Sequence, residues 1–171
     1  MRVFSAFALT LALTGCATLS KEECLNGNWE EIGFRDGTNG KASSFIQSHA
    51  KACEKTGVRP VQSLWEKGRQ RGLPAYCVPS KAYSEGRSGR SLNAVCPAAQ
   101  LPALRAANAS GLEYYEYTSE MNEIQYRLNE IDRQLVAEKN PTLRAALVQE
   151  GRSLRDRSSL LQLRRSLVAS F

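Results

Sequence analysis

The chain has very little histidine, the side chain that most often carries acid–base chemistry near neutral pH. His49 is the only histidine among its 171 residues. The serines include no G-x-S-x-G motif, which would present a nucleophile on a sharp turn. We therefore expect no enzyme, no catalytic residue and no cofactor. His49 is interpreted as a structural histidine packed beside a disulfide.

Two further patterns are missing from the sequence. A phosphate-binding glycine loop follows a strand and opens a helix, and no credible strand precedes the glycines of the chain. Zinc knuckles need cysteines two to four residues apart, and the five cysteines all lie farther apart than that. We therefore expect neither a nucleotide site nor a bound metal.

The N-terminus has the features of an export signal. Arg2 supplies positive charge, and residues 3–13 form an apolar stretch that is too short to span a bilayer. The motif Leu13-Thr14-Gly15-Cys16 follows and resembles the lipobox of bacterial lipoproteins. That resemblance implies cleavage before Cys16 and a lipid on its sulfur, so we expect residues 1–15 to be a cleaved signal peptide. The alternative is a soluble exported protein without a lipid.

A lipid on Cys16 would decide where the protein lies. Each buried methylene contributes about 0.8 kcal/mol, so two or three acyl chains anchor a protein almost permanently. The resemblance to enteric lipoproteins implies that an Asp after the cysteine retains a protein in the inner membrane, and this chain has Ala17 there. We expect the outer membrane, facing the periplasm, and no nucleic acid as a partner. The net charge of +6 favours anionic partners.

Four cysteines remain after Cys16, namely Cys24, Cys53, Cys77 and Cys96. An even set in an oxidising compartment predicts two disulfides. Four cysteines allow three pairings, and we favour Cys24 with Cys53 and Cys77 with Cys96. Each bond would then close a loop of about 20 to 30 residues, a constraint worth about 3 to 4 kcal/mol.

An aromatic residue followed by spaced glycines occurs three times in the cysteine-rich half. The copies are Trp29 with Gly33, Gly37 and Gly40, Trp65 with Gly68 and Gly72, and Tyr83 with Gly86 and Gly89. A spacing of four places glycines on one helix face, where each costs about 1 kcal/mol relative to alanine. We therefore expect another backbone to pass close to that face. The alternative is a loop at residues 35–40, which contain Asp-Gly and Asn-Gly.

Further helices are expected in the same half of the chain. Residues 41–55 favour a helix with Phe45, Ile46, His49 and Cys53 on one face. Short helices are predicted at Pro60–Arg71 and Ser80–Gly89, with Pro60 and Pro79 at their starts. Pro74 and Pro97 are assigned to loops.

The stretch from Cys24 to Pro97 is similar to an uncharacterised family of proteobacterial envelope lipoproteins that share a domain of unknown function. The residues that carry this resemblance are Cys24, Trp29, Gly33, Asp36-Gly37, Gly40, His49, Cys53, Gly68, Gly72-Leu73, Tyr76-Cys77, Gly86, Gly89 and Cys96-Pro97. Trp65 and Ser91-Leu92 depart from the tyrosines expected at those places. The resemblance implies no particular activity.

Basic residues accompany the glycine repeats, namely Lys67, Arg69, Arg71, Arg87 and Arg90. With Tyr76 and Tyr83 nearby, they would form a site for an anionic polymer such as peptidoglycan or lipopolysaccharide. The alternative is a solvated face whose charges offset neighbouring acids.

The composition shifts to strong helix formers after Gln100. Apolar residues recur at coiled-coil spacing in two runs: Tyr117, Met121, Ile124, Leu128, Ile131 and Leu135, then Leu147, Leu154, Leu161 and Val168. Leu143, Leu160, Leu163 and Leu167 are expected to widen the second run. Asn140-Pro141 separates the runs, with Asn as helix N-cap and Pro as first helical residue. This favours an antiparallel hairpin, and the alternative is one kinked helix that pairs between chains.

These patterns predict a mainly α protein. Residues 16–97 would form a small disulfide-stapled domain, and residues 98–171 a helical, coiled-coil-like tail. We expect a structural or adaptor lipoprotein whose tail contacts another envelope protein. The alternative function is a binding module for peptidoglycan or another anionic envelope polymer.

Overall fold

The computed structural model describes residues 18–169, so the expected signal peptide and Cys16 lie outside the described residues. Within residues 18–169 the chain forms helices and no strand, which confirms the mainly α class. The α-helices are α1 (Lys21–Asn26), α2 (Trp29–Thr38), α3 (Ile46–Cys53), α4 (Gln62–Tyr76), α5 (Pro79–Arg87), α6 (Leu101–Ala137) and α7 (Pro141–Leu167). Single 3₁₀ turns lie at η1 (Ser43–Phe45), η2 (Glu54–Thr56) and η3 (Ala98–Gln100).

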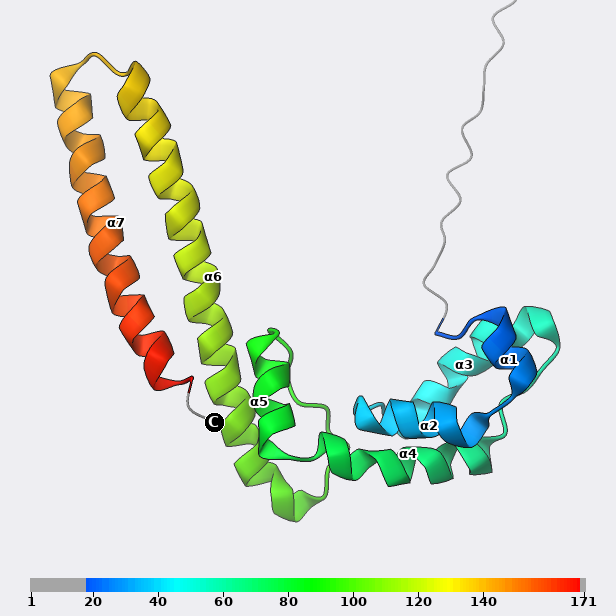
Figure 1. Cartoon of the computed structure of the whole chain (residues 1–171). Coiled ribbons are helices and arrows are strands. Elements are labelled where there is room, and N and C mark those ends of the chain that lie inside the picture. Colours follow the sequence, from blue (N-terminus) through cyan, green and yellow to red (C-terminus); the bar gives the residue numbers. More distant parts are fainter. Residues whose placement is uncertain (1–17, 170–171) are drawn as a thin grey trace, which may run out of the picture.

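The molecule has three parts that follow one another in space (Figure 1). Helices α1 to α4 form the part that we call the lobe. Helix α5 packs on the first turns of α6, and the rest of α6 pairs with α7 in a long hairpin. The hairpin and α1 lie at opposite ends of the molecule.

Helices α2 and α4 run parallel and touch through their glycines. A Cβ on Gly33 would lie less than 3.0 Å from the carbonyl oxygen of Trp65, and a Cβ on Gly68 equally close to that of Glu30. Only glycine permits this approach of two backbones. The predicted close contact is confirmed, and the helix interpretation holds up to Thr38. The turn lies at the end of the predicted 35–40 segment, after α2, where Gly40 has a positive φ of 65°.

Helices α5 and α6 repeat this arrangement. A Cβ on Gly86 would clash with the carbonyl oxygen of Asn108, and a Cβ on Gly111 with that of Tyr83. The sequence predicted the glycine of α5 but not its partner Gly111, which stands alone in a long helix-forming run. Asn108 adds hydrogen bonds from its side-chain amide to the carbonyl oxygens of Ala82 and Arg90, both at 3.0 Å.

Two proline assignments from the sequence are wrong. Pro74 lies inside α4, which continues to Tyr76. A proline so close to a helix end removes one backbone hydrogen bond, and buried Leu73 and Tyr76 hold the last turn in place by packing. Pro60 does not open α4, since the helix begins at Gln62. Pro79 does open α5, as predicted.

The two disulfides join Cys24 to Cys53 and Cys77 to Cys96, which confirms the favoured pairing. The first links α1 to the end of α3 inside the core of the lobe, where both sulfur-bearing residues are fully buried. The second links the end of α4 to the segment before α6. Each bond therefore fixes a connection that the helices alone would leave loose.

Helices α6 and α7 pack antiparallel within the chain, which confirms the hairpin (Figure 1). Asn140 caps α7 by accepting hydrogen bonds from the backbone N–H groups of Thr142 and Leu143. Arg144 donates to the carbonyl oxygens of Leu135 and Glu138 and so closes the turn between the helices. With 37 residues, α6 is about 55 Å long at 1.5 Å per residue.

The two predicted apolar runs meet between α6 and α7. Ile124, Ile131 and Leu161 are buried there. The expected widening of the second run is wrong, because its members are exposed to solvent: Leu143, Leu160, Leu163 and Leu167. A single neighbouring helix covers one stripe of α7, and these side chains lie beyond it. No helix within residues 18–169 is long and apolar enough to cross a membrane.

Candidate functional site

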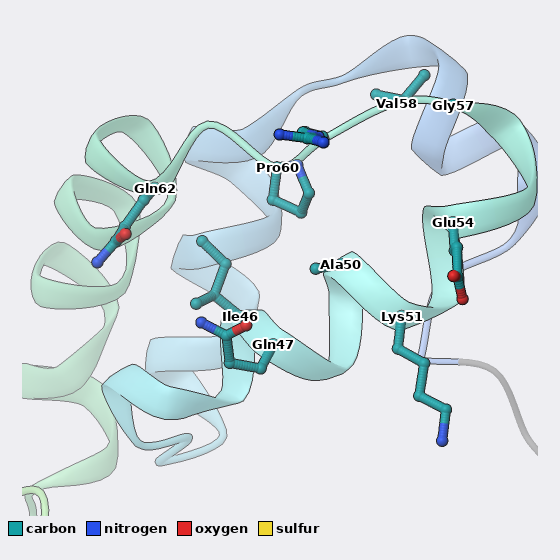
Figure 2. Close-up of a pocket in the computed structure, with 10 residues that line it drawn as sticks. Ile46, Gln47, Ala50, Lys51, Glu54, Gly57, Val58, Pro60 and Gln62 are labelled. Atoms are coloured by element: carbon teal, nitrogen blue, oxygen red, sulfur yellow. The ribbon is translucent and has the colours of Figure 1, made fainter.

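A groove beside α3 in the lobe has a volume of about 890 Å³. One wall is α3, and the other is the extended segment from Gly57 to Gln62 that leads into α4 (Figure 2). Ile46 and Ala50 face Pro60 across the groove. Apolar side chains therefore line its middle.

Three local features keep this groove open. The Cys24–Cys53 disulfide fixes the end of α3 to α1. Gly57 then ends the following 3₁₀ turn with a positive φ of 72°, which directs the chain away from α3. Val58 packs against the core of the lobe, and Pro60 restricts the segment that follows. The two walls are thus held apart by covalent and packed elements.

The polar groups of the groove are free. The side chains of Gln47, Lys51, Glu54, Arg59 and Gln62 line it, and none of the hydrogen bonds or ion pairs found within residues 18–169 involves them. Arg59 and Lys51 therefore form no ion pair with any residue of the described chain. Glu54 adds one unpaired carboxylate at the same groove.

A buried polar cluster lies next to the groove, on the inner side of α3. His49 contacts Asp36 through Nε2 and Oδ2 at 2.6 Å, and the indole N–H of Trp65 donates to the same oxygen at 2.8 Å. Both His49 and Asp36 are buried. The cluster joins α2, α3 and α4, so it fixes the helix that forms one wall of the groove.

Thr18 extends this cluster toward the N-terminus. Its hydroxyl oxygen lies 2.9 Å from Nδ1 of His49 and 3.2 Å from the carbonyl oxygen of Ser48. The order hydroxyl, imidazole, carboxylate is that of a hydrolase triad. However, none of these three residues lines the groove, and the imidazole and the carboxylate are enclosed in the core. We interpret the cluster as a clamp that holds the first described residues on the lobe.

The basic residues predicted from the glycine repeats are largely neutralised by acids. Lys67 and Arg71 both pair with Glu30, at 3.1 and 2.6 Å. Arg69 does not belong to a surface site at all, because its side chain is buried. It donates to both carboxylate oxygens of Glu66 and to the carbonyl oxygen of Lys41.

The other two predicted basic residues lie on a separate part of the molecule. Arg90 pairs with Glu85 at 2.6 Å. Arg87 lies over the ring of Tyr114, with its guanidinium carbon 4.1 Å from the ring centre. The five residues therefore do not form one continuous basic site.

The groove was missed from the sequence because its residues carry no recognisable pattern. Gln47, Arg59 and Gln62 are ordinary polar residues near helix ends, and a fold is needed to bring them together. Asp36 and His49 are 13 residues apart on different helices, so their contact had no local signal either. Within residues 18–169 no group of His, Cys, Asp and Glu could hold a metal ion.

The site belongs to a recognisable family domain. A family model described as "Protein of unknown function (DUF2799)" matches residues 28–113, half of the chain. The chain belongs to the DUF2799 family. The match begins at the N-cap of α2 and ends within α6, so the DUF2799 domain includes the groove, the glycine contacts and the buried cluster apart from Thr18. Helix α7 lies outside the matched residues.

Comparison with curated proteins and with solved structures gives no match to the chain.

Proposed function

We propose that this DUF2799 protein is a lipid-anchored lipoprotein of the outer membrane that faces the periplasm and acts as a structural or adaptor protein, and not as an enzyme. The observation that carries the proposal is the α6/α7 hairpin. It extends from the disulfide-stapled part of the chain and ends far from α1 (Figure 1). Such a shape suits contact with a second protein at a distance from a membrane.

The surface of the hairpin supports a partner-binding role. Several large apolar side chains on it are exposed, and the most exposed are Tyr126 (69%), Val136 (90%), Leu163 (60%) and Leu167 (74%). Single exposed apolar residues are common on soluble proteins. Leu160, Leu163 and Leu167 are different, because their spacing places them on one side of α7. An adaptor would use this side to dock on an apolar groove of its partner.

The position of the first described residues supports the anchor. Leu19 is buried in the core of the lobe, and Thr18 is hydrogen-bonded to His49. Cys16 is two residues earlier, and two extended residues span only about 7 Å. A lipid on Cys16 would therefore hold the lobe close to the bilayer and leave the hairpin at the far end of the molecule.

The anchor is tested by Cys16→Ser in cells that receive a clickable palmitate analogue. The unmodified chain should be labelled and should fractionate with outer membranes. The variant should lose the label and leave the membrane fraction. Ala17→Asp is the matched control, since it preserves the lipid and, by the enteric rule, should move the protein to the inner membrane. Unchanged labelling of Cys16→Ser would refute the anchor.

The adaptor role is tested by crosslinking in cells followed by mass spectrometry. Leu163→Gln/Leu167→Gln removes two exposed side chains of α7 without touching the buried contact with α6. We expect the crosslinked partners to disappear. Gln149→Ser/Ser153→Gln is the control, because it alters exposed polar residues of the same helix. Identical partners for the leucine variant, and for a chain shortened after Tyr117, would contradict an adaptor role of the hairpin.

A further inference from the structure

The groove beside α3 is equipped to bind a ligand that the adaptor role does not require. Most other basic side chains of the lobe already have partners, as Lys67 and Arg71 do with Glu30. Arg59 and Lys51 have none within the described residues. They also share the groove with two unpaired amides, those of Gln47 and Gln62. Free donors around an apolar middle are the usual composition of a site for a small polar ligand.

We propose that this groove binds a short peptide that carries carboxylate groups and a free amino group. The guanidinium of Arg59 would take a ligand carboxylate through two parallel hydrogen bonds, the strongest arrangement available to it. Lys51 at the rim would contact a second carboxylate. Gln47 and Gln62 would bond to peptide N–H and C=O groups, since an amide side chain both donates and accepts.

The remaining lining residues narrow the ligand class. Ala50 and Pro60, with the buried Ile46 behind them, form a small apolar surface that fits small side chains such as alanine methyl groups. Glu54 would pair with the amino group of the ligand and would repel a dense polyanion such as a polyphosphate. Among the described residues, no aromatic side chain lines the groove. This disfavours a sugar as the ligand, because sugar rings usually stack on aromatic faces.

Elements of the fold itself fix the shape of the groove. The disulfide at Cys53, the clamp at His49 and the turn at Gly57 fix both walls. A preformed site loses little conformational entropy on binding, so a small ligand can bind with useful affinity. The groove lies in the lobe, away from the hairpin, so its test is independent of the adaptor role.

The test is calorimetric titration of the full-length protein in detergent with the tripeptide Ala-Glu-Lys. The reference ligand is Ala-Gln-Lys-amide, which lacks both carboxylates. We expect Ala-Glu-Lys to bind and the amide to bind at least tenfold more weakly. Arg59→Gln should weaken binding of Ala-Glu-Lys by at least about tenfold, because it removes the positive charge and at least one of the two hydrogen bonds that the guanidinium would donate.

Lys55→Gln is the matched control, because it removes one exposed positive charge from the same region without lining the groove. The affinity of the Lys55→Gln variant for Ala-Glu-Lys should be unchanged. Ala50→Trp fills the groove and should abolish binding. An unchanged circular dichroism spectrum and the formation of both disulfides would show that the fold of this variant is intact. The proposal is overturned if Ala-Glu-Lys does not bind, if the amide binds equally well, or if Arg59→Gln and Lys55→Gln have the same effect on binding.

Discussion

The α2/α4 pair and the α6/α7 pair show two different ways to join helices in one chain. Helices α2 and α4 run parallel, and glycines let their backbones touch. Helices α6 and α7 run antiparallel, and a stripe of leucine and isoleucine side chains separates their backbones. The first contact tolerates almost no added volume, whereas the second can adjust side chains around a change. The difference predicts where substitutions cost most.

Gly68→Ala should have the largest effect on stability. The new methyl group would overlap the carbonyl oxygen of Glu30, and backbone atoms cannot move aside as a flexible side chain would. We expect a loss of about 4 kcal/mol or more in the free energy of unfolding. Urea denaturation followed by circular dichroism measures it.

Gly151→Ala in α7 is the matched substitution in the other pair. A Cβ there would lie 3.5 Å from the guanidinium of Arg155 and 3.8 Å from a methyl group of Leu128, which are ordinary contacts. Gly151→Ala should increase the free energy of unfolding by up to about 1 kcal/mol, because alanine favours the helix more than glycine does. Equal losses for Gly68→Ala and Gly151→Ala would mean that the two pairs do not differ in this way.

Removal of the first disulfide should have the next largest effect. Cys24→Ser/Cys53→Ser opens a loop with a sequence separation of 29 residues, and the chain-entropy estimate for that loop is about 3.5 kcal/mol. The loss should appear in the lobe and leave the α6/α7 hairpin intact. Hydrogen exchange resolved by residue measures both regions. Loss of protection along α7 in this variant would show that the hairpin depends on the lobe.

Leu161→Ala should cost less, about 2 kcal/mol. Leu161 is completely buried between α6 and α7, and leucine truncation in a core costs about 2 to 5 kcal/mol. The low end applies because only two helices meet there and can close over the space. The exposed Leu163→Ala is the control and should cost little. A loss for Leu161→Ala that equals that of Gly68→Ala would remove the contrast between the two contacts.

The sequence predicted those parts of the fold that depend on local patterns. The heptad spacing of Ile124 and Ile131 predicted the hairpin, and Asn140 predicted the start of α7. Both patterns are local, because each extends over only one or two helix turns. Cysteine parity and loop length gave both disulfides. The glycine spacing predicted that another backbone passes close by but did not identify the segment. The partner of Gly86 is Gly111 in α6, a helix that lacks the aromatic-and-glycine repeat.

The candidate site was beyond prediction for a related reason. The groove depends on how far Pro60 stands from Ala50, and that distance is set by the disulfide and by the turn at Gly57. Basic residues were chosen from the sequence by their clustering, as with Lys67 and Arg71. Clustering proved a poor guide, because the fold places Glu30 between those two. Arg59, one of the cations without an ion pair among the described residues, is separate from them in the sequence.

Acid should distinguish the α5/α6 pair, which is also joined through glycines, from the α6/α7 hairpin by the smallest of these effects. A hydrogen bond from Arg90, helped by Lys81, holds the pKa of Glu85 in α5 below its ordinary value of 4.5. In the hairpin, a hydrogen bond from Arg127 lowers the pKa of Glu150. A carboxyl whose pKa is lowered by folding stabilises the protein above its unfolded pKa, and this contribution is lost as pH falls through the folded value.

Stability should therefore decrease between about pH 5 and pH 3. Glu85→Gln should flatten this decrease more than Glu150→Gln, because the side chain of Glu85 is 12% exposed and that of Glu150 is 39% exposed. Solvent screens the more exposed pair and reduces what its charge contributes. Urea denaturation at a series of pH values measures both variants. An equal flattening by the two would show that enclosure at α5 adds nothing to the ion pair, and that the regions differ in packing alone.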